Sequence, residues 1–197
     1  MGWIDDLPMT FILASGSPRR RELLTSLGIE FTVIKTDLDE TQQDGEAPLD
    51  YVRRLSREKA NAALSMVDDK RELTVLAADT IVILDGEILG KPADEAESRA
   101  MLYRLRNRPH TVCTALTLLR SDGHPPMTEH TCTTVYMRDY SDDEIEAYIA
   151  TGDPFDKAGG YAIQHEGFHP VARIEGSYSN VVGLPVETLQ EMLKRLG

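Results

Sequence analysis

The stretch "TFILASGSPRRRELL" (Thr10–Leu24) sets the expected fold, because it predicts a buried strand that turns directly into a helix. Its first five residues, Thr10–Ala14, form a short apolar run of the kind found in buried strands. Ser17 is placed to be the N-cap of the helix, and Pro18 stands in the first turn, where proline is tolerated. Gly28 then provides a stop signal.

The rest of the chain continues to alternate strands and helices. Further strands are expected over 30–35, 73–79, 111–119 and 131–137, and a hairpin over 80–90 that turns at Asp85-Gly86. Further helices are expected over 49–65, 94–106, 142–150 and 186–196, the third of these with a capping box from Ser141 and Glu144. This alternation predicts one α/β domain over residues 1–197, with residues 1–9 as a short extension.

Composition narrows the class of protein. The 33 acidic residues outnumber the 21 Lys and Arg, and the net charge of −12 argues against a nucleic-acid polymer as partner, although a local basic pocket for a small anion stays open. No signal peptide or transmembrane stretch is recognisable, so we expect a cytoplasmic protein without a membrane partner. Cys113 and Cys132 have no CxxC spacing, which predicts two reduced thiols.

Three arginines, Arg19, Arg20 and Arg21, stand in the first turn of the first helix. The helix dipole makes this end positive, so cations are unfavourable there unless an anion joins them. For Arg21 we expect solvent exposure or pairing with Glu22. For Arg19 and Arg20 two interpretations are open, namely binding of a polyphosphate or pairing with nearby acids. The GxxxxGK[ST] pattern of a P-loop is absent.

Several charged residues lie where a phosphate or metal site would need them. Asp79 ends an apolar strand, which suits a general base or a metal ligand, but also a carboxylate that caps the turn with Thr80. Glu40, in the loop "DLDE", offers oxygen ligation to magnesium or manganese, or belongs to a solvated acidic loop. Lys91 lies at the far end of the hairpin, which could fold it back over the same site.

The segment "HEGFH" (His165–His169) matches the pattern of zinc peptidases but lacks their structural context. That chemistry needs both histidines on one face of a helix, one turn apart. Gly167 interrupts the segment and Pro170 follows it, so we expect neither a helix nor a zinc site here.

Taken together, the motifs resemble the Maf family of nucleotide pyrophosphatases. The resemblance extends over almost the whole chain, through "LASGSPRRRELL", "DLDET", "YVRRLSREKA", "AADTIVILDGEILGKP", "DKAGGYAIQ" and "GSYSNVVGLP". It implies a mixed, bent α/β sheet with two lobes around a cleft, similar to inosine triphosphate pyrophosphatases. It also implies hydrolysis of a nucleoside triphosphate to the monophosphate and pyrophosphate, assisted by a divalent metal such as magnesium or manganese.

The resemblance assigns roles by matching positions. Asp79 falls on the catalytic proton acceptor, and Glu40 falls on a polar position of the cleft. We expect Glu40, together with Asp79, to hold the metal. Substrate choice is linked to Arg19, Thr80 and Gln164. Phosphate binding is expected of Ser15, Ser17, Arg20, Lys59 and Lys91.

The segment "DKAGGYAIQ" resembles the branch that acts on dTTP and UTP. An amide such as that of Gln164 has one donor and one acceptor, which match N3–H and O4 of uracil or thymine. His165 stands where the family commonly has glycine, a place from which it could tighten the base pocket. A homodimer is also what the family suggests. The rival interpretation is a nucleotide-binding regulator of cell division that does not turn its ligand over.

Overall fold

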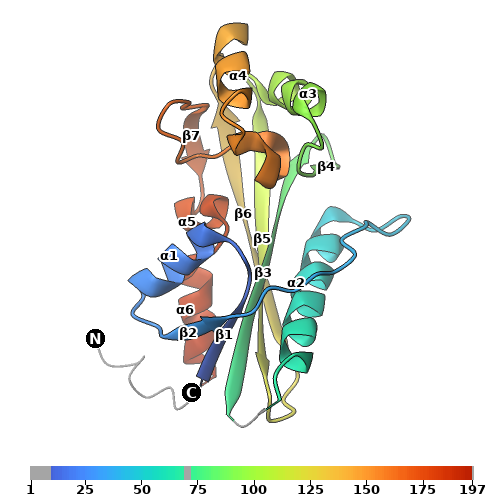
Figure 1. Ribbon diagram of the computed structural model, residues 1–197, viewed down its shortest axis with the longest axis vertical. Coiled ribbons are helices and arrows are strands. Elements are labelled where there is room, and N and C mark those ends of the chain that lie inside the picture. The colour runs from blue at the N-terminus through green and yellow to red at the C-terminus, as the bar shows by residue number, and fades with distance from the viewer. Residues whose placement is uncertain (1–9, 69–71, 197) are drawn as a thin grey trace. The chain divides into compact units, whose positions relative to one another are not determined.

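The computed structural model describes residues 10–68 and 72–196, so the extension predicted over residues 1–9 lies outside the described chain. The described part contains a seven-stranded sheet with the order β2-β1-β3-β5-β6-β7, and β4 pairs with β3 (Figure 1). Strands β1 and β2, and β1 and β3, are parallel, whereas β3 and β4, and β6 and β7, are antiparallel. The predicted mixed α/β fold is therefore confirmed.

The strands are β1 (Thr10–Ala14), β2 (Phe31–Val33), β3 (Leu73–Leu84), β4 (Glu87–Leu89), β5 (Pro109–Arg120), β6 (Met127–Met137) and β7 (Val171–Glu175). The helices are α1 (Pro18–Ser26), α2 (Pro48–Ser65), α3 (Glu95–Leu105), α4 (Asp142–Ile149), α5 (Tyr178–Val182) and α6 (Val186–Lys194), with 3-10 turns η1 (Asp153–Asp156) and η2 (Ala158–Gly160). None of these helices is long and apolar enough to cross a membrane, within the residues that are described.

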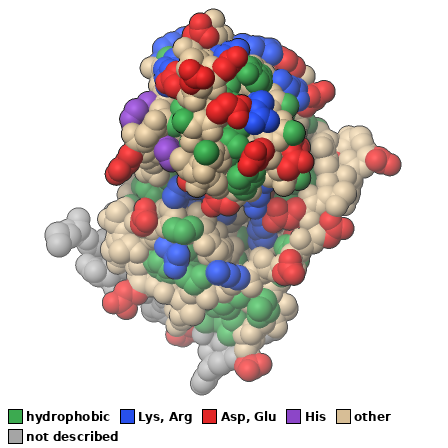
Figure 2. Space-filling view, turned by 45° about the horizontal axis from the view of Figure 1, so that its top comes forward, with side chains coloured by type: hydrophobic (Ala, Val, Ile, Leu, Met, Phe, Trp, Pro, Cys, Tyr) green, Lys and Arg blue, Asp and Glu red, His purple; other side chains and the backbone are tan. Residues whose placement is uncertain are grey.

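The chain divides into two compact units. The first contains the residues up to Asp79, Thr114–Thr131 and the residues from Gly183 onward, and the second contains Thr80–Cys113 and Cys132–Val182. Strands β3, β5 and β6 each contribute residues to both units. On the face drawn in Figure 2, acidic and basic side chains are interspersed.

The first unit has helices on both faces of its part of the sheet. Alternate residues of a strand point to opposite faces, so Phe11 and Leu13 pack with α1 and α6 through Leu24 and Leu189. The intervening residues Ile12 and Ala14 share the other core cluster with Ala60 and Ala63 of α2. Strand β1 is therefore buried on both faces, which explains its nearly continuous apolar sequence.

The second unit has a core of its own. It is formed by the ends of the long strands with the apolar faces of α3 and α4, and its members include Val82, Leu102, Val135, Ile145 and Tyr148. Each hydrophobic cluster draws its buried members from one unit only. The two units therefore have separate hydrophobic cores.

Most predicted elements are present. Ser17 caps α1 by accepting a hydrogen bond from the Arg20 amide, and Ser141 and Glu144 form the expected capping box on α4. The turn at Asp85 and Gly86 has positive φ at both residues, as a two-residue hairpin turn of type I′ requires. The segment 165–169 is not helical, as expected from its glycine and the following proline.

Two expected strand bounds were wrong, and three short elements were not predicted. Strand β3 does not end at Asp79 but continues to Leu84, because the predicted strand and the first arm of the hairpin form one uninterrupted strand. Strand β6 begins at Met127 rather than at residue 131, since pairing with its neighbour, and not an apolar pattern, defines its first residues. The short helix α5 and the two 3-10 turns were not predicted.

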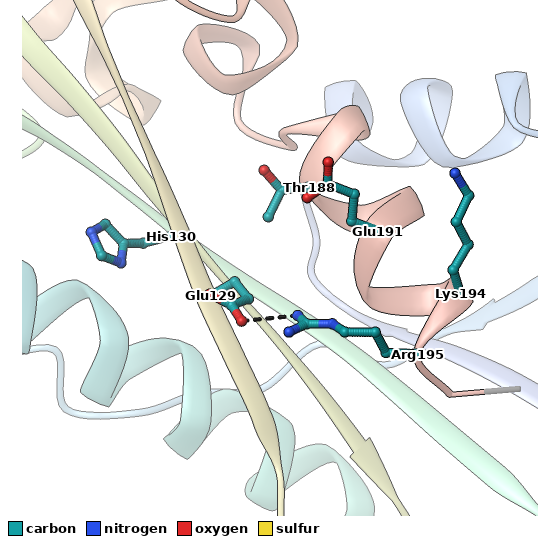
Figure 3. A pocket seen from close by; sticks show the side chains of 6 residues that line it. All are labelled: Glu129, His130, Thr188, Glu191, Lys194 and Arg195. Carbon is teal, nitrogen blue, oxygen red and sulfur yellow. Dashed lines mark hydrogen bonds and ion pairs between the residues drawn. The ribbon is translucent and has the colours of Figure 1, made fainter.

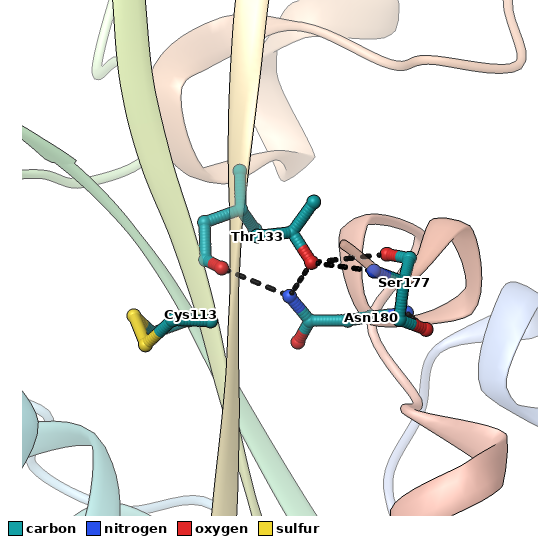
Figure 4. Close-up of a disulfide and its surroundings, with 6 residues drawn as sticks. Cys113, Thr133, Ser177 and Asn180 are labelled. Carbon is teal, nitrogen blue, oxygen red and sulfur yellow. Dashed lines mark hydrogen bonds between the residues drawn. A yellow bond between two sulfur atoms is a disulfide. The ribbon is translucent and has the colours of Figure 1, made fainter. Parts of the chain in front are cut away.

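The expectation of two reduced thiols was also wrong. Cys113 and Cys132 form a disulfide between the neighbouring strands β5 and β6, with their Cα atoms 4.2 Å apart (Figure 4). The two residues are 19 positions apart in sequence, and only the pairing of the strands brings them together. Cys113 is buried, whereas Cys132 is exposed.

Candidate active site

The connection between β1 and α1 is organised by its own side chains. Ser15 is buried, and its hydroxyl accepts hydrogen bonds from the Ser17 amide at 3.2 Å and from Arg20 Nη1 at 3.1 Å. Ser17 in turn caps the helix. The first turn of α1 contains no acidic residue, so its positive end is not neutralised from within the helix. An anion is the chemical group that this end favours.

Arg20 is hydrogen-bonded into the fold. Its Nε donates to the Gly183 carbonyl at 2.8 Å, and its Nη1 donates to the Ala78 carbonyl at 2.9 Å. Burial lowers the pKa of Arg20, while the negative charge of Asp79 acts in the opposite direction. Two backbone carbonyls therefore partly offset the unfavourable charge of Arg20 at the positive end of α1. The sequence did not indicate these two contacts.

Arg19 and Arg21 differ from Arg20. Arg19 is partly exposed, and its side chain has no hydrogen bond or ion pair within residues 10–68 and 72–196. Arg21 is exposed, as expected. Arg19 and Arg21 thus both present their charges without a partner in the described chain, and Arg19 is the less exposed of the two.

Asp79 lies in β3, two residues beyond Ala77, the last residue of β3 that pairs with β1. The register of the parallel pair ends at Ala14 and Ala77, after which β1 turns into α1 and β3 continues. Asp79 is 7% exposed, so a carboxylate is held almost buried just past the carboxyl end of a parallel strand. Ligand sites of open α/β sheets lie at such ends.

Lys59 joins Asp79 to Glu40. Its Nζ lies 2.6 Å from Asp79 Oδ1 and 2.8 Å from Glu40 Oε1, so one ammonium contacts both carboxylates. The Lys59 side chain is 13% exposed and projects from α2, whereas Glu40 is exposed in the loop after β2. The structure thus brings together three of the residues that the resemblance singled out. Two carboxylates beside several cations can bind a polyphosphate together with a divalent cation.

Two residues of α2 that the sequence analysis did not single out hold the loop with Glu40. The Tyr51 hydroxyl donates to the Glu40 carbonyl at 2.8 Å, and burial with the charges of Asp79 and Glu40 raises the pKa of Tyr51 to about 12. Arg54 donates to the Thr41 carbonyl at 3.1 Å. Tyr51 lies about two helical turns before Lys59, so the two residues share one face of α2. This spacing is the signal in the sequence that could have placed Tyr51 near the site.

Arg54 also fixes the far end of that loop. Its Nε and Nη2 donate to the two carboxylate oxygens of Glu46 at 2.7 and 2.8 Å. These hydrogen bonds lower the pKa of Glu46 to about 2. Both ends of the segment that contains Glu40 are therefore attached to α2.

The remaining predicted residues, Thr80, Lys91 and Gln164, belong to the second unit. Thr80 follows Asp79 within β3, Lys91 is exposed after β4, and Gln164 is exposed in the segment after η2. Within the described residues the Gln164 side chain has no hydrogen bond, which leaves its donor and acceptor available.

The described residues contain no group of three or more His, Cys, Asp or Glu that could hold a metal ion. A pocket of about 460 Å³ in the first unit involves β6 and α6 (Figure 3). It is lined by Glu129, His130, Thr188, Glu191, Lys194 and Arg195. None of these is a predicted site residue, and Arg195 is paired with Glu129 at 2.9 Å.

Comparison with protein families gives a match along almost the whole described chain. The family model described as Maf-like protein matches residues 10–196. The chain belongs to the Maf family. The predicted family resemblance is thereby confirmed, and Glu40, Lys59 and Asp79 all lie inside the matched region.

Relatives of this Maf family chain include enzymes named for their substrates. The dTTP/UTP pyrophosphatase of Citrifermentans bemidjiense is 46% identical over 188 residues, which cover 95% of this chain and 96% of that protein. The dTTP/UTP pyrophosphatase of Geotalea uraniireducens is 48% identical over 186 residues, which cover 94% of each chain.

A solved structure shares the fold of this Maf family chain. The Staphylococcus aureus Ham1 protein aligns with a TM-score of 0.53 at 16% identity, covering 95% of this chain and all of that one. At this identity the likeness concerns the fold alone.

Proposed function

We propose that this protein hydrolyses dTTP and UTP to the corresponding nucleoside monophosphate and pyrophosphate. The observation that carries the proposal is the contact of Lys59 with both Asp79 and Glu40, just past the end of β1 and in the same unit as the cationic start of α1. The names of relatives at 46–48% identity support the choice of reaction and substrates.

The triphosphate is expected at the N-terminus of α1. The Arg19 amide and the unpaired Arg19 side chain offer positive charge to the phosphates, and Lys59 adds an ammonium at the acidic pair. Arg20 fixes this turn through Gly183 and Ala78 and contributes its charge from a partly buried position. We assign Ser15 and Ser17 to shaping the turn, because their hydroxyls already take part in hydrogen bonds there.

Asp79 is assigned the role of general base. It accepts a proton from a water molecule whose oxygen attacks the α-phosphorus, the bond from that phosphorus to the bridging oxygen breaks, and pyrophosphate leaves. Lys59 fixes the Asp79 carboxylate at 2.6 Å, which orients the base before substrate arrives. The cations of α1 are assigned to neutralise charge on the leaving pyrophosphate.

The donors fit a divalent cation that is shared with substrate. Magnesium is usually bound by one or two carboxylates together with substrate phosphates and water, and Glu40 and Asp79 supply two hard oxygen ligands that both contact the Lys59 ammonium. When bound, such a cation would neutralise phosphate charge and polarise the α-phosphorus. Magnesium or manganese is therefore the cofactor that we propose.

Base selection is assigned to Gln164, together with Thr80. The Gln164 amide is exposed and offers one donor and one acceptor, which match O4 and N3–H of uracil or thymine. Cytosine presents the reverse pattern at those atoms, so CTP would leave polar groups unpaired. We also propose a cytoplasmic location, where nucleoside triphosphates are used, and a homodimer, which light scattering of the purified protein would test.

The test is a panel of ribo- and deoxyribonucleoside triphosphates with the purified protein and magnesium. Chromatography of the products should show UMP and dTMP with one pyrophosphate each, and chelation of the metal should stop the reaction. Release of orthophosphate and a diphosphate instead would contradict the proposed bond cleavage. Tight binding of UTP without turnover would favour the non-catalytic regulator.

A further inference from the structure

Tyr148 connects α4 to both ends of the segment that precedes Gln164. It is 1% exposed and lies in the last turn of α4. Its hydroxyl donates to Asp153 Oδ2 at 2.7 Å and accepts a hydrogen bond from the Ala162 amide at 3.0 Å. One oxygen atom therefore ties the start of η1 to a residue two positions before Gln164.

The Tyr148 ring makes contacts on the other side of Gln164. It stacks on Phe168, with ring centroids 4.5 Å apart, and meets the edge of His165 at 4.9 Å. His165 Nδ1 accepts a hydrogen bond from the Gly167 amide at 3.1 Å, which restrains the orientation of its ring. Tyr148 thus contacts the chain before and after Gln164, while Gln164 itself stays exposed.

Asp153 is held in place by a second partner. Lys157 is 7% exposed, and its Nζ donates to Asp153 Oδ1 at 2.8 Å and to the Asp153 carbonyl at 2.6 Å. Because Oδ1 accepts from Lys157 and Oδ2 from Tyr148, both carboxylate oxygens are occupied. Burial raises the pKa of Tyr148, so its hydroxyl stays protonated and continues to donate.

The turn between these attachments is fixed by glycine. Gly159 has φ of +71°, and a side chain there would approach Val82 Cγ2 to 3.0 Å. Its amide donates to the Gly90 carbonyl at 2.9 Å, next to Lys91. The backbone from Asp153 to Phe168 is therefore attached at its start, its turn, Ala162 and its end.

We propose that Tyr148 is a positioning residue for base recognition: its hydroxyl, fixed by Asp153, sets the place of Gln164 opposite the pyrimidine ring. The inference rests on the proposed function and adds a residue that does not touch substrate. An amide displaced by a fraction of an ångström loses two hydrogen bonds to the base at once, whereas the phosphate contacts of the first unit are unaffected.

The test compares Tyr148→Phe with Tyr140→Phe. Tyr140 is equally buried, its hydroxyl donates to the Leu102 carbonyl at 2.7 Å, and its ring also contacts Phe168. Both variants keep the ring and lose one buried hydroxyl, but only Tyr148 is bonded to Asp153 and Ala162. The measurements are the ratio of kcat/KM for UTP over CTP and the exchange rate of the Ala162 amide with solvent deuterium.

Tyr148→Phe should lower the UTP over CTP ratio about tenfold or more and speed exchange at Ala162. Tyr140→Phe should keep the ratio within about twofold of the unsubstituted protein, since its hydroxyl has no partner between η1 and Gln164. If Tyr148→Phe does not fold, Asp153→Asn serves instead, because its side-chain amide has only one acceptor for the two donors Tyr148 and Lys157.

A protein that cleaves UTP and CTP equally before any substitution would overturn the proposed function and this inference with it. A normal preference for UTP that survives in Tyr148→Phe would overturn the inference alone. An equal fall of the ratio in Tyr148→Phe and Tyr140→Phe would also overturn it, because the effect would then follow from loss of any buried hydroxyl in this core.

Discussion

Arg19 and Arg20 are neighbours in the first turn of α1, yet they have different surroundings. Arg20 donates to the carbonyls of Gly183 and Ala78, whereas the Arg19 side chain has no partner within the described residues. The sequence indicated an unusual cluster of charge at this place. The sequence did not show which of the two arginines is bonded into the fold, because the partner Gly183 lies 163 positions after Arg20.

The two arginines should respond differently to substitution in the absence of ligand. Arg20→Ala should lower the free energy of unfolding by about 1.5–3 kcal/mol, since buried carbonyls lose a charged donor. Arg19→Ala should leave it unchanged or raise it by a few tenths of a kcal/mol, because a cation is removed from the positive end of a helix. Urea unfolding of both variants measures this, and an equal loss in each would contradict the assignment.

Gln164→Glu should damage the use of UTP more than that of CTP. The substitution keeps the length of the side chain but replaces a donor and an acceptor by two acceptors, so O4 of uracil would face a carboxylate oxygen. A repelled polar group costs about 1–3 kcal/mol, which corresponds to roughly one to two powers of ten in kcat/KM. An unchanged ratio of kcat/KM for UTP over CTP would show that Gln164 does not read the base.

At the scale of elements, a few adjacent residues were sufficient to predict where a helix begins and where a turn needs glycine. The cap at Ser17, the capping box at Ser141 and the turn at Gly86 are properties of a few adjacent residues, and all are present. The continuation of β3 past Asp79 and the pairing of Cys113 with Cys132 depend on which strands are neighbours. Neighbours in a sheet are set by the whole fold, so these features were not predicted.

The disulfide between β5 and β6 should contribute to stability. Cys132→Ser should lower the free energy of unfolding by about 2–4 kcal/mol, because the link restricts the unfolded chain over 19 residues. The exposed Cys132 should be accessible to a reductant, so a reducing agent should lower the stability of the unsubstituted protein to that of the variant. Two free thiols titrated in the folded, unreduced protein would argue against the bond.

At the scale of the whole molecule, the sequence predicted one α/β domain of the Maf family but not how the core is divided. Each unit has its own apolar clusters, and three strands supply residues to both. A pattern of apolar residues indicates burial, but it does not say which of two cores a strand residue enters. The candidate site residues were named from the sequence. Tyr51, which contacts the loop with Glu40, and Tyr148, which contacts the segment around Gln164, were not.

Stability should fall in mild acid because of His110 in the second unit. His110 is 4% exposed with Nε2 2.6 Å from the Tyr161 hydroxyl, and burial lowers its pKa to about 4. The unfolded chain takes up a proton near pH 6.5 and the folded chain does not, so stability is full above pH 6.5 and falls as the pH approaches 4.

The expected loss between pH 7 and pH 5 is about 2 kcal/mol, from about 1.4 kcal/mol for each pKa unit. Urea unfolding at the two pH values measures it, with His110→Gln as the control that should lack this part of the loss. The same fall in stability in His110→Gln would assign the pH dependence to other groups.

The most direct test of the account is the initial rate of pyrophosphate release from UTP by Asp79→Asn at saturating magnesium. The matched control is Asp44→Asn, the same chemical change at an exposed position in the loop that contains Glu40. Asp79→Asn removes the general base and should lower kcat at least about 100-fold while the protein stays folded, and Asp44→Asn should keep the normal rate. A folded Asp79→Asn protein that releases pyrophosphate at nearly the normal rate would contradict the assignment of Asp79 as the catalytic residue.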